Sequence, residues 1–138
     1  MQVTYKELSF SAPHPLAEKL FTDKTACFDI ETTGFSPQNT SLYLIGCAVR
    51  KQNRICIHQF FADTAAEEKN ILEAFLELLS ACDTVVTYNG ARFDIPYLKS
   101  KCAQLLLNDP FDFLRSVDIY REIYPFQHLL KLTDCRQK

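Results

Sequence analysis

Apolar runs in the first half of the chain predict three consecutive β-strands. Residues 25–30 form the first, which ends in Thr-Gly turn chemistry. "SLYLIGCAVR" and "RICIHQFFA" are also of strand length, and the short link "KQN" between them favours a hairpin. Residues 1–24 give weaker patterns, which suggest a short extended segment and a helical turn opened by Pro15.

In the second half of the chain, the spacing of apolar residues becomes that of a helix. Apolar residues at 71, 72, 75, 78 and 79 recur at helical spacing, after "TAAE" with the spacing of a capping box at residues 64–67. A buried strand "DTVVTYNG", a helix "DIPYLKSKCAQLLLNDP" and a possible strand "FLRSVDIY" follow, and "PFQHLLKLTDC" resembles the start of another helix. A meander followed by a helical crossover predicts an α/β domain with a mixed sheet, whose fourth strand is parallel to one of the first three.

Composition narrows the class of protein. The 138 residues, 47% hydrophobic and 23% charged, fit one globular domain. No apolar run is long enough for a membrane span, and the N-terminus has no signal-peptide core, so we expect a cytoplasmic protein without membrane contact. Six cysteines with no C-x-x-C pair are typical of small core residues in a reducing compartment, not of disulfides or a zinc site.

Two acidic residues, Asp29 and Glu31, lie at the exit of the first predicted strand. Positions i and i+2 of a strand project from one face, and ligands of open α/β sheets usually bind at the carboxyl ends of strands. Two such carboxylates can hold Mg²⁺ or Mn²⁺ through oxygen ligands. The net charge of −2 gives no sign of a basic surface that binds nucleic acid. It does not exclude an enzyme that acts on nucleic acid, because the carboxylates of a metal site lower the net charge. Taken alone, the two residues could also be a strand end that reaches solvent.

Asp94 is the candidate for a third acid, because it follows the fourth predicted strand and the Asn89-Gly90 turn. If that strand lies parallel beside the first, Asp94 arrives at the same sheet edge, where three acids could hold two metal ions about 3.5–4 Å apart. By itself Asp94 could be a helix N-cap, and Asn89-Gly90 an ordinary turn. Gly34 and Gly90 adjoin these acids, which favours a close approach of the backbone to a ligand or a positive φ.

The segments "FDIETTG" and "TYNGARFDIPYL" together resemble motifs I and II of the DEDD, or DnaQ-like, 3′–5′ exonuclease superfamily, and are most similar to its YprB-like bacterial branch. The resemblance spans roughly residues 26–107. It implies a ribonuclease H-like mixed sheet with a three-strand meander and helix–strand crossovers. It also implies hydrolysis of phosphodiester bonds at the 3′ ends of single-stranded DNA or RNA, by a two-metal mechanism with Mg²⁺ or Mn²⁺.

The resemblance implies a role for each residue of the two motifs. Asp29 would bridge the two metal ions, Glu31 would bind one of them, and Asp94 would hold the other directly or through water. The residues implied in binding the strand are Thr32, Thr33 and Gly34 through their backbone, Asn89 and Phe93 beside the strand, Phe35 or Phe93 as a stacking face, and Arg92 at a phosphate.

The superfamily's third motif, which supplies a fourth acid and a Tyr or His that orients water, has no match. Its forms are Tyr-x-x-x-Asp and His-x-x-x-x-Asp. Tyr120 is followed four residues on by Tyr124, and Tyr124 by His128, while His128 to Asp134 is one residue too long. Asp118 resembles an acid that is not a metal ligand in relatives.

We therefore expect a single domain over residues 1–138 that is truncated at its C-terminus. Truncation would uncover apolar surface, to be covered by a missing C-terminal segment or in a homodimer. Without the third motif, the chain lacks the residue that orients water, and general acid–base catalysis contributes about 10²–10⁴-fold in rate. An alternative is therefore a catalytically incomplete ribonuclease H-like module that binds nucleic acid or a partner protein. Endonucleolytic cleavage of an RNA–DNA hybrid uses the same metal chemistry and is a third possibility. Both DNA and RNA remain open as substrates.

Overall fold

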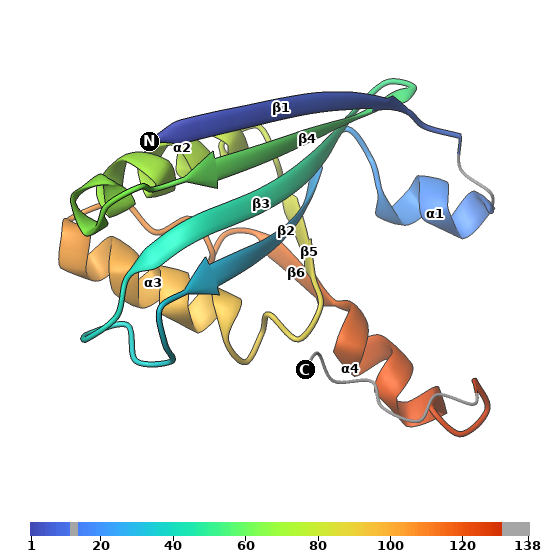
Figure 1. Cartoon of the computed structure of the whole chain (residues 1–138). Helices are drawn as coiled ribbons and strands as arrows, with labels where there is room; N and C mark the ends of the chain where they lie inside the picture. The colour runs from blue at the N-terminus through green and yellow to red at the C-terminus, as the bar shows by residue number, and fades with distance from the viewer. Residues whose placement is uncertain (12–13, 131–138) are drawn as a thin grey trace.

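A six-stranded sheet organises the molecule, in the order β1-β4-β3-β2-β5-β6 (Figure 1). The computed structural model describes residues 1–11 and 14–130. The strands are β1 (Gln2–Ser9), β2 (Thr25–Thr32), β3 (Leu42–Lys51), β4 (Arg54–Phe61), β5 (Thr84–Thr87) and β6 (Arg115–Asp118). The helical segments are α1 (Pro15–Leu20), α2 (Glu68–Leu79), α3 (Asp94–Leu105) and α4 (Ile119–Ile123), with 3₁₀ turns η1 (Ala65–Glu67) and η2 (Tyr124–Phe126).

The pairing of the strands confirms the predicted mixed sheet. β2, β3 and β4 form an antiparallel meander, in which β3 and β4 are joined by a tight hairpin turn with Gln52 at φ 56°. After the α2 crossover, β5 lies parallel to β2, and β6 lies parallel to β5. The fourth predicted strand is thus parallel to the first, which aligns the carboxyl ends of β2 and β5.

The N-terminal strand β1 is longer than the weak pattern of residues 1–24 suggested. It pairs antiparallel with β4 over its whole length, from Gln2 opposite Phe61 to Ser9 opposite Arg54. All eight of its residues are exposed. Neither face of β1 is buried within the described part of the chain, so its sequence needs no regular alternation of apolar and polar residues.

One face of the sheet carries the hydrophobic core. Phe28 of β2 contacts the rings of Phe75 on α2 and Phe111, with centroid distances of 5.1 and 6.1 Å. Figure 1 shows α2 and α3 on the same side of the sheet. The buried core side chains include Ala26, Ile30, Ile45, Ile71, Leu72, Leu79, Val85, Tyr97, Leu98 and Cys102. These contacts bury alternate residues of β2 and leave Asp29 and Glu31 on the opposite face.

Two local predictions differ from the structure. Thr64 makes no side-chain capping bond, and Glu67 instead accepts hydrogen bonds from the backbone N–H of Asp63 at 2.8 Å and from the amino terminus of Met1. In place of the capping bond from Thr64, Glu67 thus binds Met1, which directly precedes β1, a contact that local spacing does not reveal. The helix predicted in "PFQHLLKLTDC" begins with the short turn η2, and its residues beyond 130 lie outside the described part.

Five cysteines fall within the described residues, and all are free thiols: Cys27, Cys47, Cys56, Cys82 and Cys102. Burial raises the pKa of the Cys27 and Cys102 thiols to about 11, so they stay protonated at neutral pH. Within the described ranges, no helix combines the length and apolar character needed to cross a membrane.

Candidate active site

Asp29 and Glu31 lie near the carboxyl end of β2, on the face opposite the core, and both are exposed. The register of β2 against β3 shifts between Glu31 and Thr32. Such a bulge bends a strand locally and is common beside functional sites. The two carboxylates therefore project from the sheet where β2 ends.

Asp94 reaches this sheet edge from a different element. It is the first residue of α3, follows β5 and its turn, and is only 5% exposed. Its Oδ1 accepts the backbone N–H of Ile30 at 3.1 Å. Because Ile30 lies between Asp29 and Glu31, this bond fixes the start of α3 against the acidic end of β2.

The Asp94 carboxyl is held in a setting that disfavours its charge. Its pKa is raised from 3.8 to about 6, mainly by burial and next by the negative charge of the neighbouring Asp29 carboxyl, with a smaller contribution from a hydrogen bond to Asp29. The Ile30 N–H acts in the opposite direction but does not compensate. Two carboxyls in contact need a shared proton or a cation between them when both would otherwise ionise.

Two of the three predicted carboxylates are placed together in a way that suits a hard cation. Asp29 and Asp94 supply carboxylate oxygens, which Mg²⁺ and Mn²⁺ prefer, and they come from two rigid elements. In the conformation of residues 1–11 and 14–130, no group of three His, Cys, Asp or Glu side chains is placed to hold a metal ion. Glu31 shares a strand face with Asp29, and its role as a third ligand stays a prediction.

The turn that leads to Asp94 is held by Asp118, which the sequence set apart from the metal ligands. The buried Asp118 carboxylate accepts the backbone N–H groups of Asn89, Ala91 and Tyr120 at 2.7, 3.1 and 3.1 Å. Asn89 adopts φ 62°, a left-handed conformation that Asn tolerates better than most residues. Asp118 thus positions the segment before Asp94.

Gly34 and Gly90 do not adopt the positive φ that was one of the two expectations, and both have a packing role. No glycine among the described residues has a positive φ. A Cβ on Gly34 would lie 2.8 Å from Cγ2 of Thr40, and one on Gly90 would lie 2.5 Å from Cβ of Thr87. Each glycine leaves room for a threonine side chain of its own loop or turn beside the acids.

We expect Gly90→Ala to destabilise the fold by about 1–3 kcal/mol, because Cβ of Thr87 is on rigid strand backbone and cannot move aside. Gly46→Ala is the matched control, since a Cβ there meets nothing within 4 Å. Urea unfolding of the two variants measures the difference. Equal stabilities would contradict the packing role of Gly90.

The loop between β2 and β3 uses its hydroxyl groups internally. The Thr32 hydroxyl donates to the carbonyl of Gly34 at 2.8 Å, and Oγ1 of Thr33 accepts the N–H of Ser41 at 2.9 Å. The Thr40 hydroxyl reaches Gly34, Ser36 and Tyr97 within 3.3 Å. These bonds give the loop a defined shape beside Asp29 and Glu31.

A buried ion pair that sequence reasoning missed supports this loop. Nζ of Lys101 lies 2.9 Å from Oε1 of Glu68, and their side chains are only 5% and 11% exposed. Lys101 also donates to the carbonyl of Thr40 at 2.5 Å, and Glu68 accepts the N–H of Leu42 at 2.6 Å. The pair joins α2 and α3 to the end of the loop.

Exposed aromatic surface lies next to the acids. Phe35 is 88% exposed, and its ring meets Phe93 edge-on at 5.9 Å. Phe93 in turn contacts Tyr97 at 5.5 Å. Two predicted stacking residues are thus brought together, one after β2 and one just before Asp94.

The acidic face of the sheet is hollowed, and this hollow of about 440 Å³ is lined in part by Asp29, Gly46, Ile57, Tyr88 and Ile119. Two buried oxygens at the nearby turn, Oγ1 of Thr87 and Oδ1 of Asn89, have no hydrogen-bond partner among the described residues. Unsatisfied polar atoms of this kind are uncommon in native folds and often occur at sites that receive a ligand or water.

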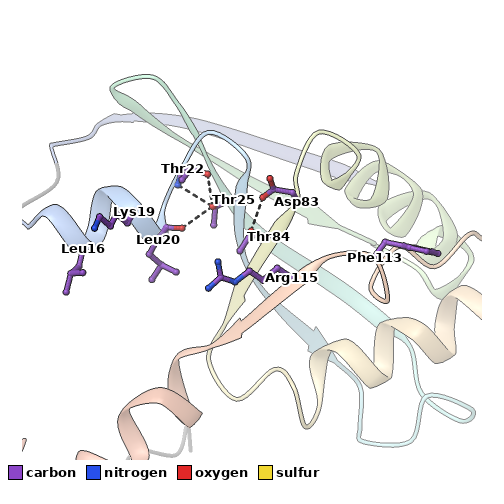
Figure 2. Close-up of a pocket in the computed structure, with 9 residues that line it drawn as sticks. All are labelled: Leu16, Lys19, Leu20, Thr22, Thr25, Asp83, Thr84, Phe113 and Arg115. Carbon is purple, nitrogen blue, oxygen red and sulfur yellow. Dashed lines mark hydrogen bonds between the residues drawn. The ribbon is translucent and has the colours of Figure 1, made fainter.

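A second cavity, of about 770 Å³, lies at the other end of the parallel strands (Figure 2). Thr25, Thr84 and Arg115, which begin β2, β5 and β6, line it together with Lys19 of α1. None of the predicted site residues lines this cavity. The acids lie at the carboxyl ends of these strands and the cavity at their amino ends.

Comparison with known proteins gives a family and a fold. Residues 26–137 match the family model described as RNase_H superfamily. Among solved structures, the family B DNA polymerase of the hyperthermophilic archaeon Pyrobaculum calidifontis is similar, with a TM-score of 0.62 and 20% sequence identity. The similarity covers 74% of this chain and 16% of the polymerase chain, and at this identity it indicates a common fold. The comparison with curated proteins gives no match.

Proposed function

Because the chain belongs to the RNase_H superfamily, we propose that it is a metal-dependent 3′–5′ exonuclease that hydrolyses phosphodiester bonds at single-stranded DNA or RNA ends. The observation that carries this proposal is the contact between Asp29 and Asp94 at the carboxyl ends of two parallel strands. A buried carboxyl beside a second carboxyl is costly for stability, which favours a functional reason for its position.

Asp29 and Asp94 would hold Mg²⁺ or Mn²⁺, with Glu31 as a further ligand from the same strand face. Bound divalent ions neutralise charge on the phosphate and lower the pKa of water in such sites. The chain's own contribution is placement. The Ile30 N–H fixes Asp94, and Asp118 fixes the turn before it.

The strand end would lie against the aromatic pair of exposed Phe35 and half-buried Phe93, which offers a stacking face beside the acids. Arg92, which is exposed on the same turn, would bind a phosphate. The backbone of Thr32, Thr33 and Gly34, in its internally bonded loop, would border the terminal nucleotide, as would Asn89. This arrangement accounts for aromatic, cationic and acidic groups converging on one edge.

Binding without catalysis is the second candidate, because the described residues hold no group of three potential metal ligands and the third motif has no match in the sequence. A thermal shift distinguishes metal binding from turnover. Mn²⁺ should raise the Tm of the wild type but not that of Asp29→Asn, since only a ligand that prefers the folded state stabilises it. Metal stabilisation that survives Asp29→Asn would show that the site is elsewhere.

The activity test uses 5′-labelled single-stranded DNA and RNA with Mn²⁺. We expect a descending ladder from the wild type and from Asp23→Asn, an exposed control, and no ladder from Asp29→Asn. Internal fragments in place of a ladder would indicate an endonuclease. A folded wild type that binds Mn²⁺ and the oligonucleotide but leaves it intact would establish the binding module.

A further inference from the structure

A pocket of about 420 Å³ lies next to the proposed active site and is lined by Arg92, Tyr120, Arg121 and Tyr124. Arg92 belongs to the turn between β5 and α3, two residues before Asp94. The other three come from α4 and η2, which follow β6 and extend away from the sheet (Figure 1). The pocket thus unites two segments that Asp118 already joins through the N–H groups of Ala91 and Tyr120.

The charged groups of this pocket are available to an anion. Within residues 1–11 and 14–130, Arg92 has no ion-pair partner. Arg121 is 62% exposed, and its Nε lies 4.0 Å from Oδ2 of Asp118. That carboxylate already accepts three backbone N–H groups. Two guanidinium groups therefore face the pocket with much of their hydrogen-bonding capacity unused.

The aromatic groups form a continuous path from the acids to the pocket. Tyr88 lines the hollow that contains Asp29 and meets Tyr120 edge-on at 5.8 Å. Tyr120 contacts Tyr124 at 5.4 Å, and Tyr124 is 49% exposed. A ladder of three tyrosines thus leads from the acidic face to the arginines, and its last ring is open to solvent.

We propose that this pocket, the Arg92–Tyr124 pocket, binds a second nucleotide of the single strand whose end lies at Asp29 and Asp94. Arg92 and Arg121 bind its phosphate, and the exposed ring of Tyr124 stacks on its base. This inference rests on the proposed function for the position of the strand end. A single strand fits because it offers bases that can stack on an exposed ring and phosphates that can bind the two arginines, and the pocket holds both kinds of group.

The test is the affinity of the full chain for 5′-labelled oligo(dT) and oligo(U) decamers, measured by fluorescence anisotropy in EDTA so that no hydrolysis occurs. We expect Arg121→Gln to weaken binding about tenfold and to reduce the slope of log K against log salt by about 0.7, the value for one phosphate contact to a single strand. Tyr124→Leu should weaken binding by about 5- to 100-fold, whereas Tyr124→Phe keeps the ring and the affinity.

Arg115→Gln is the matched charge control, because Arg115 is an exposed cation at the amino end of β6, whereas the pocket follows the carboxyl end of that strand, and Arg115 is directed toward α1 (Figure 2). It should leave both affinity and salt slope unchanged. Equal losses in Arg115→Gln and Arg121→Gln would overturn the pocket, as would competition by inorganic phosphate at the same concentration as the decamer. Circular dichroism of each variant establishes that it is folded.

The two proposals fail in different ways. A wild type that binds the decamer through Arg121 and Tyr124 but releases no nucleotide with Mn²⁺ would refute the exonuclease and support the pocket. A wild type that degrades the decamer, with an affinity and a KM that are unchanged in Arg121→Gln and Tyr124→Leu, would support the exonuclease and refute the pocket.

Discussion

Asp94→Asn is expected to be more stable than the wild type at neutral pH in EDTA, by about 1–3 kcal/mol. The asparagine Oδ1 can still accept the Ile30 N–H, but the side chain has no charge to desolvate and none to repel Asp29. The pKa of Asp94 is about 6 in the folded protein, against an ordinary value of 3.8. Each pKa unit corresponds to about 1.4 kcal/mol, so this shift sets the size of the effect.

The pH dependence of this difference follows from the direction of the shift. Below about pH 3, Asp94 is protonated in both the folded and the unfolded chain, and its raised pKa costs nothing. As the pH rises toward 6, the unfolded chain ionises first, so the wild type loses stability relative to Asp94→Asn. Above about pH 7 both states are ionised, and the difference becomes constant.

Urea unfolding between pH 4 and 8 measures this curve, with Asp23→Asn as a control at an exposed carboxylate. A parallel pH dependence in wild type and Asp94→Asn would mean that Asp94 titrates normally. The same substitution should reduce nucleotide release by about 10²- to 10³-fold, as expected when one electrostatic group is removed from an active site. Increased stability with lost activity would identify Asp94 as a functional group and not as a helix cap.

Lys101→Met is expected to destabilise the protein by about 3–5 kcal/mol, because it leaves the Glu68 carboxylate buried without a counter-charge. It also removes the donor that satisfies the carbonyl of Thr40. The double variant Lys101→Met/Glu68→Gln should recover most of the loss. A glutamine is neutral and can still accept the N–H of Leu42.

Lys99→Met is the control for this cycle, since Lys99 pairs with Asp112 at the surface, and exposed ion pairs contribute little. Denaturant unfolding of the wild type, Lys101→Met, Glu68→Gln and the double variant gives the coupling energy between Lys101 and Glu68. A loss in Lys101→Met no larger than in Lys99→Met would contradict the buried pair. A variant that stays folded but binds oligonucleotide more weakly would connect the pair to the loop that precedes Thr40.

The sequence predicted the features that depend on the periodic spacing of apolar residues within one strand or helix. Alternation in β2 places Asp29 and Glu31 on one face, and a helical crossover makes β5 parallel to β2, which is enough to bring Asp94 to the same edge. The sequence did not predict that Asp94 binds the Ile30 N–H, because this bond depends on how deeply α3 packs against the sheet.

Other features depend on contacts between distant residues and leave no local signal. Lys101 looks like an ordinary helical lysine until α2 supplies Glu68. In the sequence, Tyr120 and Tyr124 stand out only because they fail to match the third motif, whereas the structure brings their rings on α4 and η2 into contact. The sequence predicts β1 only weakly, because both faces of this strand are exposed and no alternation of apolar and polar residues is required.

The position of β1 also has a consequence for how the chain is made. Its partner in the sheet is β4, so Gln2–Ser9 cannot pair until Arg54–Phe61 has left the ribosome. At about 5–20 residues per second, β1 therefore stays without its partner for roughly 3–10 s. Lys6 and Glu7 place charges of both signs along it, and charged residues hinder pairing between the strands of neighbouring nascent chains during this interval.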